Sequence, residues 1–296
     1  MSTDDPLSRA VALGVSVDAL AALAAHIRIE TEGIPADPAV RAVLADIATE
    51  LLGAQNAPIE QSAPVVGLAR TFVAQAADLI DDPGRSGGWD RIDPVLLQSI
   101  GRLSGAIVGA FTAAQQRIPD LREPLNSPRA RFLDVGTGTG WLAIGAARAY
   151  PNLSVVGIDI FDAALELARA NVAASGVSDR IELRRQDVTT LCDSDGFDAV
   201  WLPLPFRPES IVPAAVEAAI GALRPRGWVL AGTFAGPPGV LPELLTDLRT
   251  VRSGGRPWRG EDLLGVLRAA GLDATQEVPR SWPAPVRLYV GQRPAR

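Results

Sequence analysis

The chain has 296 residues, enough for one large domain or two ordinary ones with a sizeable buried core. Apolar residues make up 47% and charged residues 21%, a globular rather than a disordered composition. Its 28 basic and 34 acidic side chains leave a net charge of −6. Because no basic run is present, binding to a phosphate backbone is disfavoured, and we expect no nucleic-acid partner. The single cysteine, Cys192, excludes an internal disulfide.

The N-terminal sequence does not look like a targeting segment. It lacks a basic region followed by an apolar core, which a signal peptide requires. No uninterrupted apolar stretch reaches the ~18 residues needed to span a bilayer. We therefore expect a soluble, cytoplasmic protein without a membrane partner.

The first part of the chain, residues 1–125, has the start and stop signals of helices. Asp37 and Asp93 each precede a proline, which places a capping carboxylate before a favoured first helical residue. Gly53 is suited to end the helix that begins after Asp37. The segment 81–88, DDPGRSGG, is a loop by composition. An apolar stripe at helical spacing predicts a further long helix through Leu96, Ile100, Leu103, Ile107 and Phe111.

The pattern changes in residues 126–296, where short apolar runs alternate with helical stretches. The runs RFLDVG, SVVGIDI, RIELRRQDV, FDAVWLPL and GWVLAGTFA read as strands. Such alternation predicts right-handed crossovers and a parallel sheet covered on both faces. The last two runs, ATQEVPRSW and VRLYVGQR, are separated only by a short turn that contains proline, which suits a hairpin. We therefore predict an α/β, Rossmann-like, doubly wound domain that ends in an antiparallel strand.

A glycine-rich turn joins the first predicted strand to the first helix, in the sequence FLDVGTGTG. Glycines at 136, 138 and 140 let a ligand approach the backbone, and the helix N-terminus offers free N–H groups. The spacing is GxGxG, not the GxGxxG of a dinucleotide turn. Asp134 precedes the first glycine by two residues. A carboxylate there suits a ligand that bears an ammonium group and would repel a pyrophosphate.

Two further aspartates follow the next two strands. Asp159 ends the second strand, where an acidic residue can accept hydrogen bonds from both ribose hydroxyls. Asp187, followed by Val188, ends the third strand, where a carboxylate can receive an adenine amino group. Each could instead be a helix cap or a loop carboxylate, but three in register at successive strand ends point to one ligand-binding crevice.

These motifs, in order and spacing, resemble those of class I S-adenosylmethionine (SAM)-dependent methyltransferases over residues 130–293. The resemblance implies a seven-stranded sheet whose last-but-one position holds the antiparallel strand. It also implies SAM as the cofactor and no metal. The helical front section is similar to accessory domains that precede small-molecule methyltransferases, which implies a homodimer or a substrate cap. The cofactor-binding residues that it implies are Asp134, Gly136, Thr137, Gly138, Gly140, Asp159, Ile160, Asp187, Val188 and Trp201.

The sequence after the fourth strand bears on the methyl acceptor. Enzymes that methylate nucleobase or protein-amide nitrogens carry Asn-Pro-Pro-Tyr/Phe there, whereas this chain has LPLPF, without the asparagine. This departure favours a small, partly apolar acceptor, for example a natural-product intermediate. Aromatic and apolar residues near the expected crevice are the candidate substrate contacts: Trp141, Leu202, Phe206 and Trp258.

No residue stands out as a catalytic base. The only histidine, His26, lies in the front helical section and is a weak candidate, since a lone histidine there is more often structural. We expect SAM-dependent methyl transfer that relies mainly on alignment of acceptor and methyl group. The alternatives are a methyltransferase fold repurposed for another reaction such as a cyclisation, a non-enzymatic regulator, and a dehydrogenase.

Overall fold

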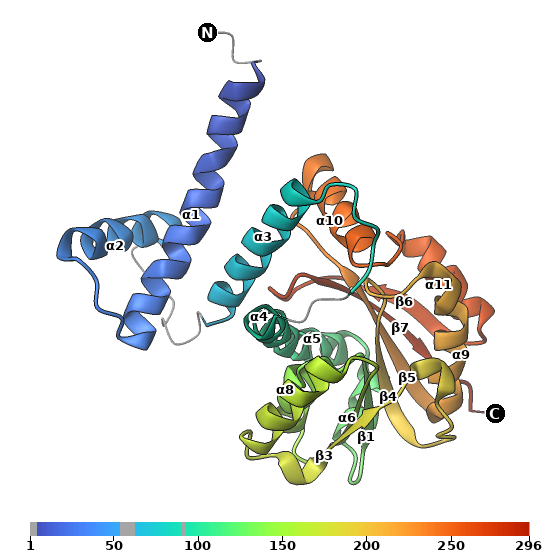
Figure 1. Cartoon of the computed structure of the whole chain (residues 1–296). Coiled ribbons are helices and arrows are strands. Elements are labelled where there is room, and N and C mark those ends of the chain that lie inside the picture. Colours follow the sequence, from blue (N-terminus) through green and yellow to red (C-terminus); the bar gives the residue numbers. More distant parts are fainter. Residues whose placement is uncertain (1–4, 54–62, 90–92, 296) are drawn as a thin grey trace. The chain divides into compact units, whose positions relative to one another are not determined.

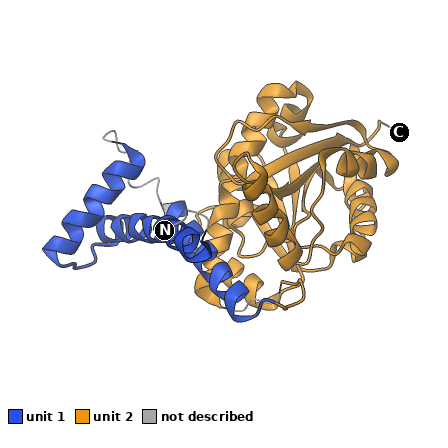
Figure 2. Ribbon diagram, turned by 90° about the horizontal axis from the view of Figure 1, so that it is seen from above, with its two compact units in different colours: residues 1–83 blue, residues 84–296 orange. Residues whose placement is uncertain are grey.

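The computed structural model describes residues 5–53, 63–89 and 93–295. The chain forms two compact units, residues 1–83 and residues 84–296, coloured blue and orange in Figure 2.

The first unit consists of helices. Helix α1 begins after Asp5, whose carboxylate accepts a hydrogen bond from the backbone N–H of Ser8 at 3.2 Å, and it ends at Gly33, whose φ is 65°. Helix α2 is capped by Asp37 and ends at Gly53, as predicted. Helix α1 contacts the other two helices. The helices are α1 (Pro6–Glu32), α2 (Pro38–Leu52) and α3 (Ala63–Asp81).

One expectation about membranes needs correction. Helices over Pro6–Glu32 and Pro94–Arg117 are long and apolar enough to cross a bilayer by length and composition alone. The sequence argument missed them because it required an uninterrupted apolar run, whereas a few charged residues do not prevent insertion. Core helices and signal sequences pass the same test, so this finding is weak evidence for a membrane span.

The second unit opens with helices that pack on the sheet domain. Helix α4 (Pro94–Gly105) begins after Asp93, whose carboxylate accepts from the N–H of Leu96 at 2.7 Å. The predicted long helix is interrupted, and α5 (Val108–Arg117) follows after two residues. A 3₁₀ turn and α6 (Arg122–Asn126) lead into the sheet.

The boundary between the units therefore differs from the predicted one at residue 125. Helices α4 and α5 contact α7, the first helix after the glycine turn. Phe111 of α5 is fully buried and its ring contacts the rings of Phe132 and Trp201. These helices thus share the hydrophobic core of the sheet domain, although their sequence resembles that of the helices before them.

The sheet has seven strands in the order β3-β2-β1-β4-β5-β7-β6, as the family resemblance implied. The five strands β3, β2, β1, β4 and β5 are parallel to one another, and β7 is antiparallel to both β5 and β6. The strands are β1 (Arg131–Val135), β2 (Ser154–Asp159), β3 (Ile181–Arg185), β4 (Phe197–Pro203), β5 (Leu223–Phe234), β6 (Asp273–Val278) and β7 (Val286–Gln292).

Helices cover both faces of this sheet (Figure 1). One face carries a core that includes Phe111, Leu142 and Trp201, and the other carries a core that includes Val216 and Leu263. Because both faces are covered, the central strands β2 and β4 are largely apolar on both sides, whereas the edge strand β3 is partly exposed. The covering helices of the second unit include α7 (Trp141–Ala149), α8 (Asp162–Ala173), α9 (Val212–Ala222), α10 (Val240–Arg252) and α11 (Gly260–Ala269).

Candidate active site

A cavity of about 490 Å³ lies in the second unit where β1, β2 and β4 end, within the size range of small-molecule sites. Parallel strands that end at one edge leave a crevice there, as the doubly wound topology requires. The predicted residues on its wall are Gly136, Thr137, Gly138, Asp159, Ile160, Asp187 and Val188.

The glycine turn has the backbone conformation that its sequence predicts. Gly136, Gly138 and Gly140 have φ values of 68°, 55° and 80°, in the region that only glycine adopts readily. Gly140 is not on the cavity wall. A Cβ at Gly140 would lie 3.3 Å from the Cβ of Ala168, so this glycine permits close packing of α7 on α8.

Asp134 is buried beneath the turn. One carboxylate oxygen accepts a hydrogen bond from the Thr137 hydroxyl at 2.8 Å. The other oxygen is buried and makes no hydrogen bond of normal geometry with the described residues, although the backbone N–H of Ala143 is close enough to lower the pKa of the carboxyl. Burial raises the pKa of Asp134 to about 7, against the hydrogen bond from Thr137. A buried, half-satisfied carboxylate is suited to receive an ammonium group.

Asp159 links the second strand to the glycine turn. Its two oxygens accept hydrogen bonds from the backbone N–H groups of Gly138 at 2.8 Å and Phe161 at 2.9 Å. Burial raises the pKa of Asp159, while these hydrogen bonds and the charge of Arg207 lower it. The carboxylate is therefore held in a fixed orientation at the cavity wall.

Asp187 and Ile160 complete the far end of the cavity. Asp187 accepts a hydrogen bond from the N–H of Thr189 at 2.8 Å and caps the 3₁₀ turn Val188–Thr190. Asp187 thus caps the 3₁₀ turn and also lines the cavity. Ile160 is 62% exposed, which leaves an apolar surface free to contact a flat ligand.

A second, smaller cavity of about 100 Å³ shares wall residues with the first, including Gly136 and Phe206. Asp134 and Trp201 also line it. Apart from Asp134 and a few hydroxyl-bearing side chains, its wall is apolar and includes Phe234. The two cavities thus border one another across the glycine turn and the end of β4.

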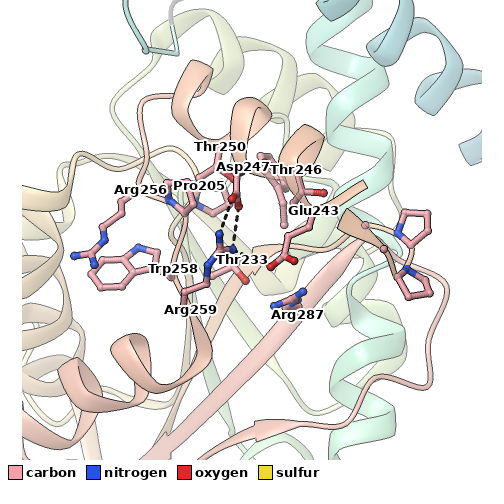
Figure 3. Close-up of a pocket in the computed structure, with 16 residues that line it drawn as sticks. Pro205, Thr233, Glu243, Thr246, Asp247, Thr250, Arg256, Trp258, Arg259 and Arg287 are labelled. Carbon is pink, nitrogen blue, oxygen red and sulfur yellow. Dashed lines mark hydrogen bonds and ion pairs between the residues drawn. The ribbon is translucent and has the colours of Figure 1, made fainter. Parts of the chain in front are cut away.

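A third cavity, of about 260 Å³, shares Pro205, Thr233 and Phe234 with the second. Figure 3 shows it between the end of β5, the start of β7 and helix α10. Arg259 forms ion pairs there with Asp247 at 2.7 Å and with Glu243 at 3.1 Å. We call the second cavity the neck and the third the outer cavity. The outer cavity is markedly more polar than the neck.

Two of the four predicted substrate contacts line these cavities. Phe206 lines the first and second, and Trp258 the third. Trp141 and Leu202 line none of the three. The indole N–H of Trp141 donates to the side chain of Gln98 at 2.8 Å, and Leu202 is fully buried in the core.

Trp201, predicted to bind cofactor, lines only the small second cavity. His26 lies in α1 of the first unit, whereas all three cavities are formed by the second unit. Its catalytic role stays a prediction.

Sequence reasoning missed part of the cavity wall. Leu97, Ile100, Gly101 and Ser104 of α4 line the largest cavity, although they come from the section assigned to an accessory domain. Arg207 also lines it. The one sequence signal for Arg207 was a charged residue directly after an apolar strand and the proline-rich run.

Comparison with known proteins agrees with this geometry. Residues 132–227 match the family described as "Methyltransferase domain". A tRNA1(Val) (adenine(37)-N6)-methyltransferase of Porphyromonas gingivalis is 35% identical over 112 residues, 36% of this chain and 41% of that protein. A release factor glutamine methyltransferase of Rhodopirellula baltica is 27% identical over 170 residues, 56% of this chain and 54% of that protein. The chain thus spans about half or less of these relatives' lengths.

Solved structures share the fold over nearly the whole chain. The pyocyanin biosynthetic protein PhzM has a TM-score of 0.64 at 18% identity, covering 97% of this chain and 98% of that chain. Human N-acetylserotonin methyltransferase in complex with SAM has a TM-score of 0.63 at 16% identity, covering 99% of both. The chain therefore carries a methyltransferase domain with the class I, SAM-dependent type of fold, preceded by a helical region.

Proposed function

We propose that this protein binds SAM in the 490 Å³ cavity and transfers its methyl group to a small-molecule acceptor. The observation that carries this proposal is that Asp159 and Asp187, at the ends of adjacent strands, line this cavity. Asp134 on the next strand lines the smaller cavity, which shares Gly136 and Thr137 with the first. Asp134 and Thr137 would hold the methionine end, Asp159 the ribose, and Asp187 with Ile160 the adenine.

The residues present fit this cofactor. The unpaired oxygen of buried Asp134 lacks a donor that an ammonium group would supply. The positive φ of Gly136 and Gly138 keeps side chains out of the space between them and Asp159. SAM supplies a methyl group on a charged sulfur, so the chain's main task is to align the acceptor and exclude water.

The shape of the neighbouring cavities supports a small acceptor. The apolar 100 Å³ cavity adjoins the glycine turn, and Trp201, Phe206 and Phe234 on its wall suit an aromatic or otherwise flat group. The 260 Å³ cavity beyond it would take a polar substituent. The matched relatives include enzymes named for tRNA and for protein glutamine, but the net charge of −6 disfavours a nucleic-acid acceptor.

Two measurements test the proposal. Titration calorimetry is expected to detect binding of S-adenosylhomocysteine (SAH), and its absence would reject the cofactor assignment. Incubation with methyl-labelled SAM and separate panels of small phenols, small amines, total tRNA and ribosomal protein then compares acceptors. Label transferred to tRNA or protein, and not to small molecules, would overturn the acceptor class. SAM binding without transfer to any panel would favour the alternative of a repurposed fold.

We also propose that the helical first unit forms a homodimer. Helix α1 exposes Val11, Leu13 and Val15 by 63–66% of their surface, and Val40 and Val43 of α2 are more than half exposed. Exposed apolar side chains in such number on two helices favour an interface over a solvated surface.

Light scattering of the full chain after gel filtration tests this proposal. A mass near twice 31.1 kDa is expected. Val11→Arg is expected to shift the mass towards the monomer, with Val95→Arg, at an exposed site in α4, as control. A monomer at all concentrations, or retention on phospholipid vesicles through α1, would reject the dimer.

A further inference from the structure

Arg207 is held on the wall of the 490 Å³ cavity by its own turn. Its backbone N–H donates to the carbonyl of Leu204 at 3.2 Å, and its side-chain Nε donates to the carbonyl of Pro203 at 3.1 Å. The Nη2 atom lies 3.6 Å from the position that a Cβ on Gly136 would take. The guanidinium group therefore faces the first glycine of the turn.

The charge of Arg207 lacks a direct partner. Within the part of the chain that the structure describes, no ion pair joins Arg207 to a carboxylate, and only its Nε has a hydrogen-bond acceptor. Burial lowers the pKa of Arg207, while the more distant charges of Asp159 and Asp187 raise it. The Arg207 side chain is half-buried on the cavity wall, and a guanidinium in that position is suited to pair with an anion. The free N–H groups at Nη1 and Nη2 thus point to an anionic ligand group in the cavity.

We propose that Arg207 binds the carboxylate of the methionine moiety of SAM. A guanidinium fork matches a carboxylate in geometry and charge. This inference rests on the proposed cofactor and adds a residue that discriminates its amino-acid end. With Asp134 available for the ammonium group, one acidic and one basic side chain beside the glycine turn would bind the two charged groups of an α-amino acid.

The placement favours the cofactor over the acceptor as the source of this carboxylate. Arg207 lines the 490 Å³ cavity and lines neither the neck nor the outer cavity. Its Nη2 faces Gly136, next to the proposed methionine end. An acceptor carboxylate would instead be expected to meet a residue of the outer cavity, such as Arg287.

The test compares three ligands by calorimetry on the full chain: SAH, decarboxylated SAH, which lacks only the carboxylate, and 5′-methylthioadenosine, which lacks the amino-acid end. Arg207→Gln is expected to weaken SAH binding by about tenfold or more, and to change the other two by less than about threefold. Arg207→Lys should restore part of the SAH affinity, since it keeps the charge without the fork.

Arg185→Gln is the matched control, because Arg185 is exposed, pairs with Asp162, and does not line the cavity. It is expected to leave all three affinities unchanged. Unchanged SAH binding by Arg207→Gln, or an equal loss for all three ligands in a variant that is folded by circular dichroism, would overturn the inference. Failure of wild-type protein to bind any of the three would instead reject the proposed cofactor.

Discussion

The carboxylate of Asp159 accepts a hydrogen bond from the backbone N–H of Gly138 at 2.8 Å, which joins the end of β2 to the middle of the glycine turn. Its other oxygen holds the N–H of Phe161 at 2.9 Å. One side chain thus orients the turn and offers its remaining lone pairs to a ligand. The position is a structural tie and, under the proposed function, a cofactor contact as well.

Replacing Asp159 with alanine is therefore expected to weaken SAH binding by about tenfold or more, because the ribose loses its acceptor and the turn loses its tie. Calorimetry measures the affinity. Asp162→Ala, at an exposed carboxylate three residues further on, is the control and should bind normally. Unchanged affinity in Asp159→Ala would refute the site assignment.

The raised pKa of Asp134 predicts that the free energy of unfolding depends on pH. Its pKa is about 7 in the folded protein against an ordinary 3.8, so the folded state binds more protons than the unfolded state between these values. The free energy of unfolding must therefore fall as pH rises through this window. Asp134→Asn removes this effect and is expected to be more stable than wild type at pH 8, by roughly 2–4 kcal/mol, with less difference near pH 4.

Urea unfolding of both proteins at pH 4, 6 and 8 checks this expectation. The difference between the two proteins isolates Asp134 from other titrating groups. A difference that stays constant across this range would show that the Asp134 carboxyl titrates at an ordinary pKa.

Gly232 of β5 provides a way to separate the acceptor site from the cofactor site. A Cβ there would lie 2.1 Å from the ring of Trp201, so Gly232→Ala must displace this ring, which lines the neck cavity. Overpacking is expected to cost about 1–3 kcal/mol of stability. Methyl transfer should fall by about tenfold or more because a small misalignment is costly, while SAH affinity should stay within about threefold.

Labelled methyl transfer and SAH calorimetry on the same preparation provide the two readouts. Gly221→Ala serves as control, since a Cβ at that helical glycine meets nothing within 4 Å. If SAH affinity falls as steeply as transfer, Trp201 belongs to the cofactor site, as the sequence analysis predicted.

Gln98 of α4 is expected to stabilise the region beneath the turn. Its carbonyl oxygen accepts from the indole of Trp141 at 2.8 Å and from Asn171 at 3.1 Å, and Asn171 also donates to the carbonyl of Thr139. Gln98→Ala leaves the indole N–H of Trp141 without a partner and removes one acceptor of Asn171, and it is expected to cost about 1–3 kcal/mol. Thermal unfolding measures the loss. Gln276→Ala, at an exposed position on β6, should cost little, and an equal effect would contradict the network.

The strand ends and the glycine turn could be predicted because their signals are local. At positions 136, 138 and 140 the backbone has positive φ values, which glycine adopts readily and other residues rarely do. Asp159 and Asp187 lie at strand termini, and parallel strands bring their carboxyl ends to one edge whatever covers the sheet. The hydrogen bond of Trp141 could not be predicted because its partner, Gln98, lies 43 residues earlier in the chain.

The sequence by itself determined the fold class and the carboxylates at the strand ends, of which Asp159 and Asp187 line the 490 Å³ cavity; the arrangement of the last strands was implied by the family resemblance. Each of these depends on hydrophobic period, on glycine, or on position along a strand. The tertiary structure alone decided that α4 and α5 belong to the sheet domain and that Arg207 faces Gly136. Those outcomes depend on which apolar faces pack together and on how a proline-rich turn directs one side chain, and no local pattern records either.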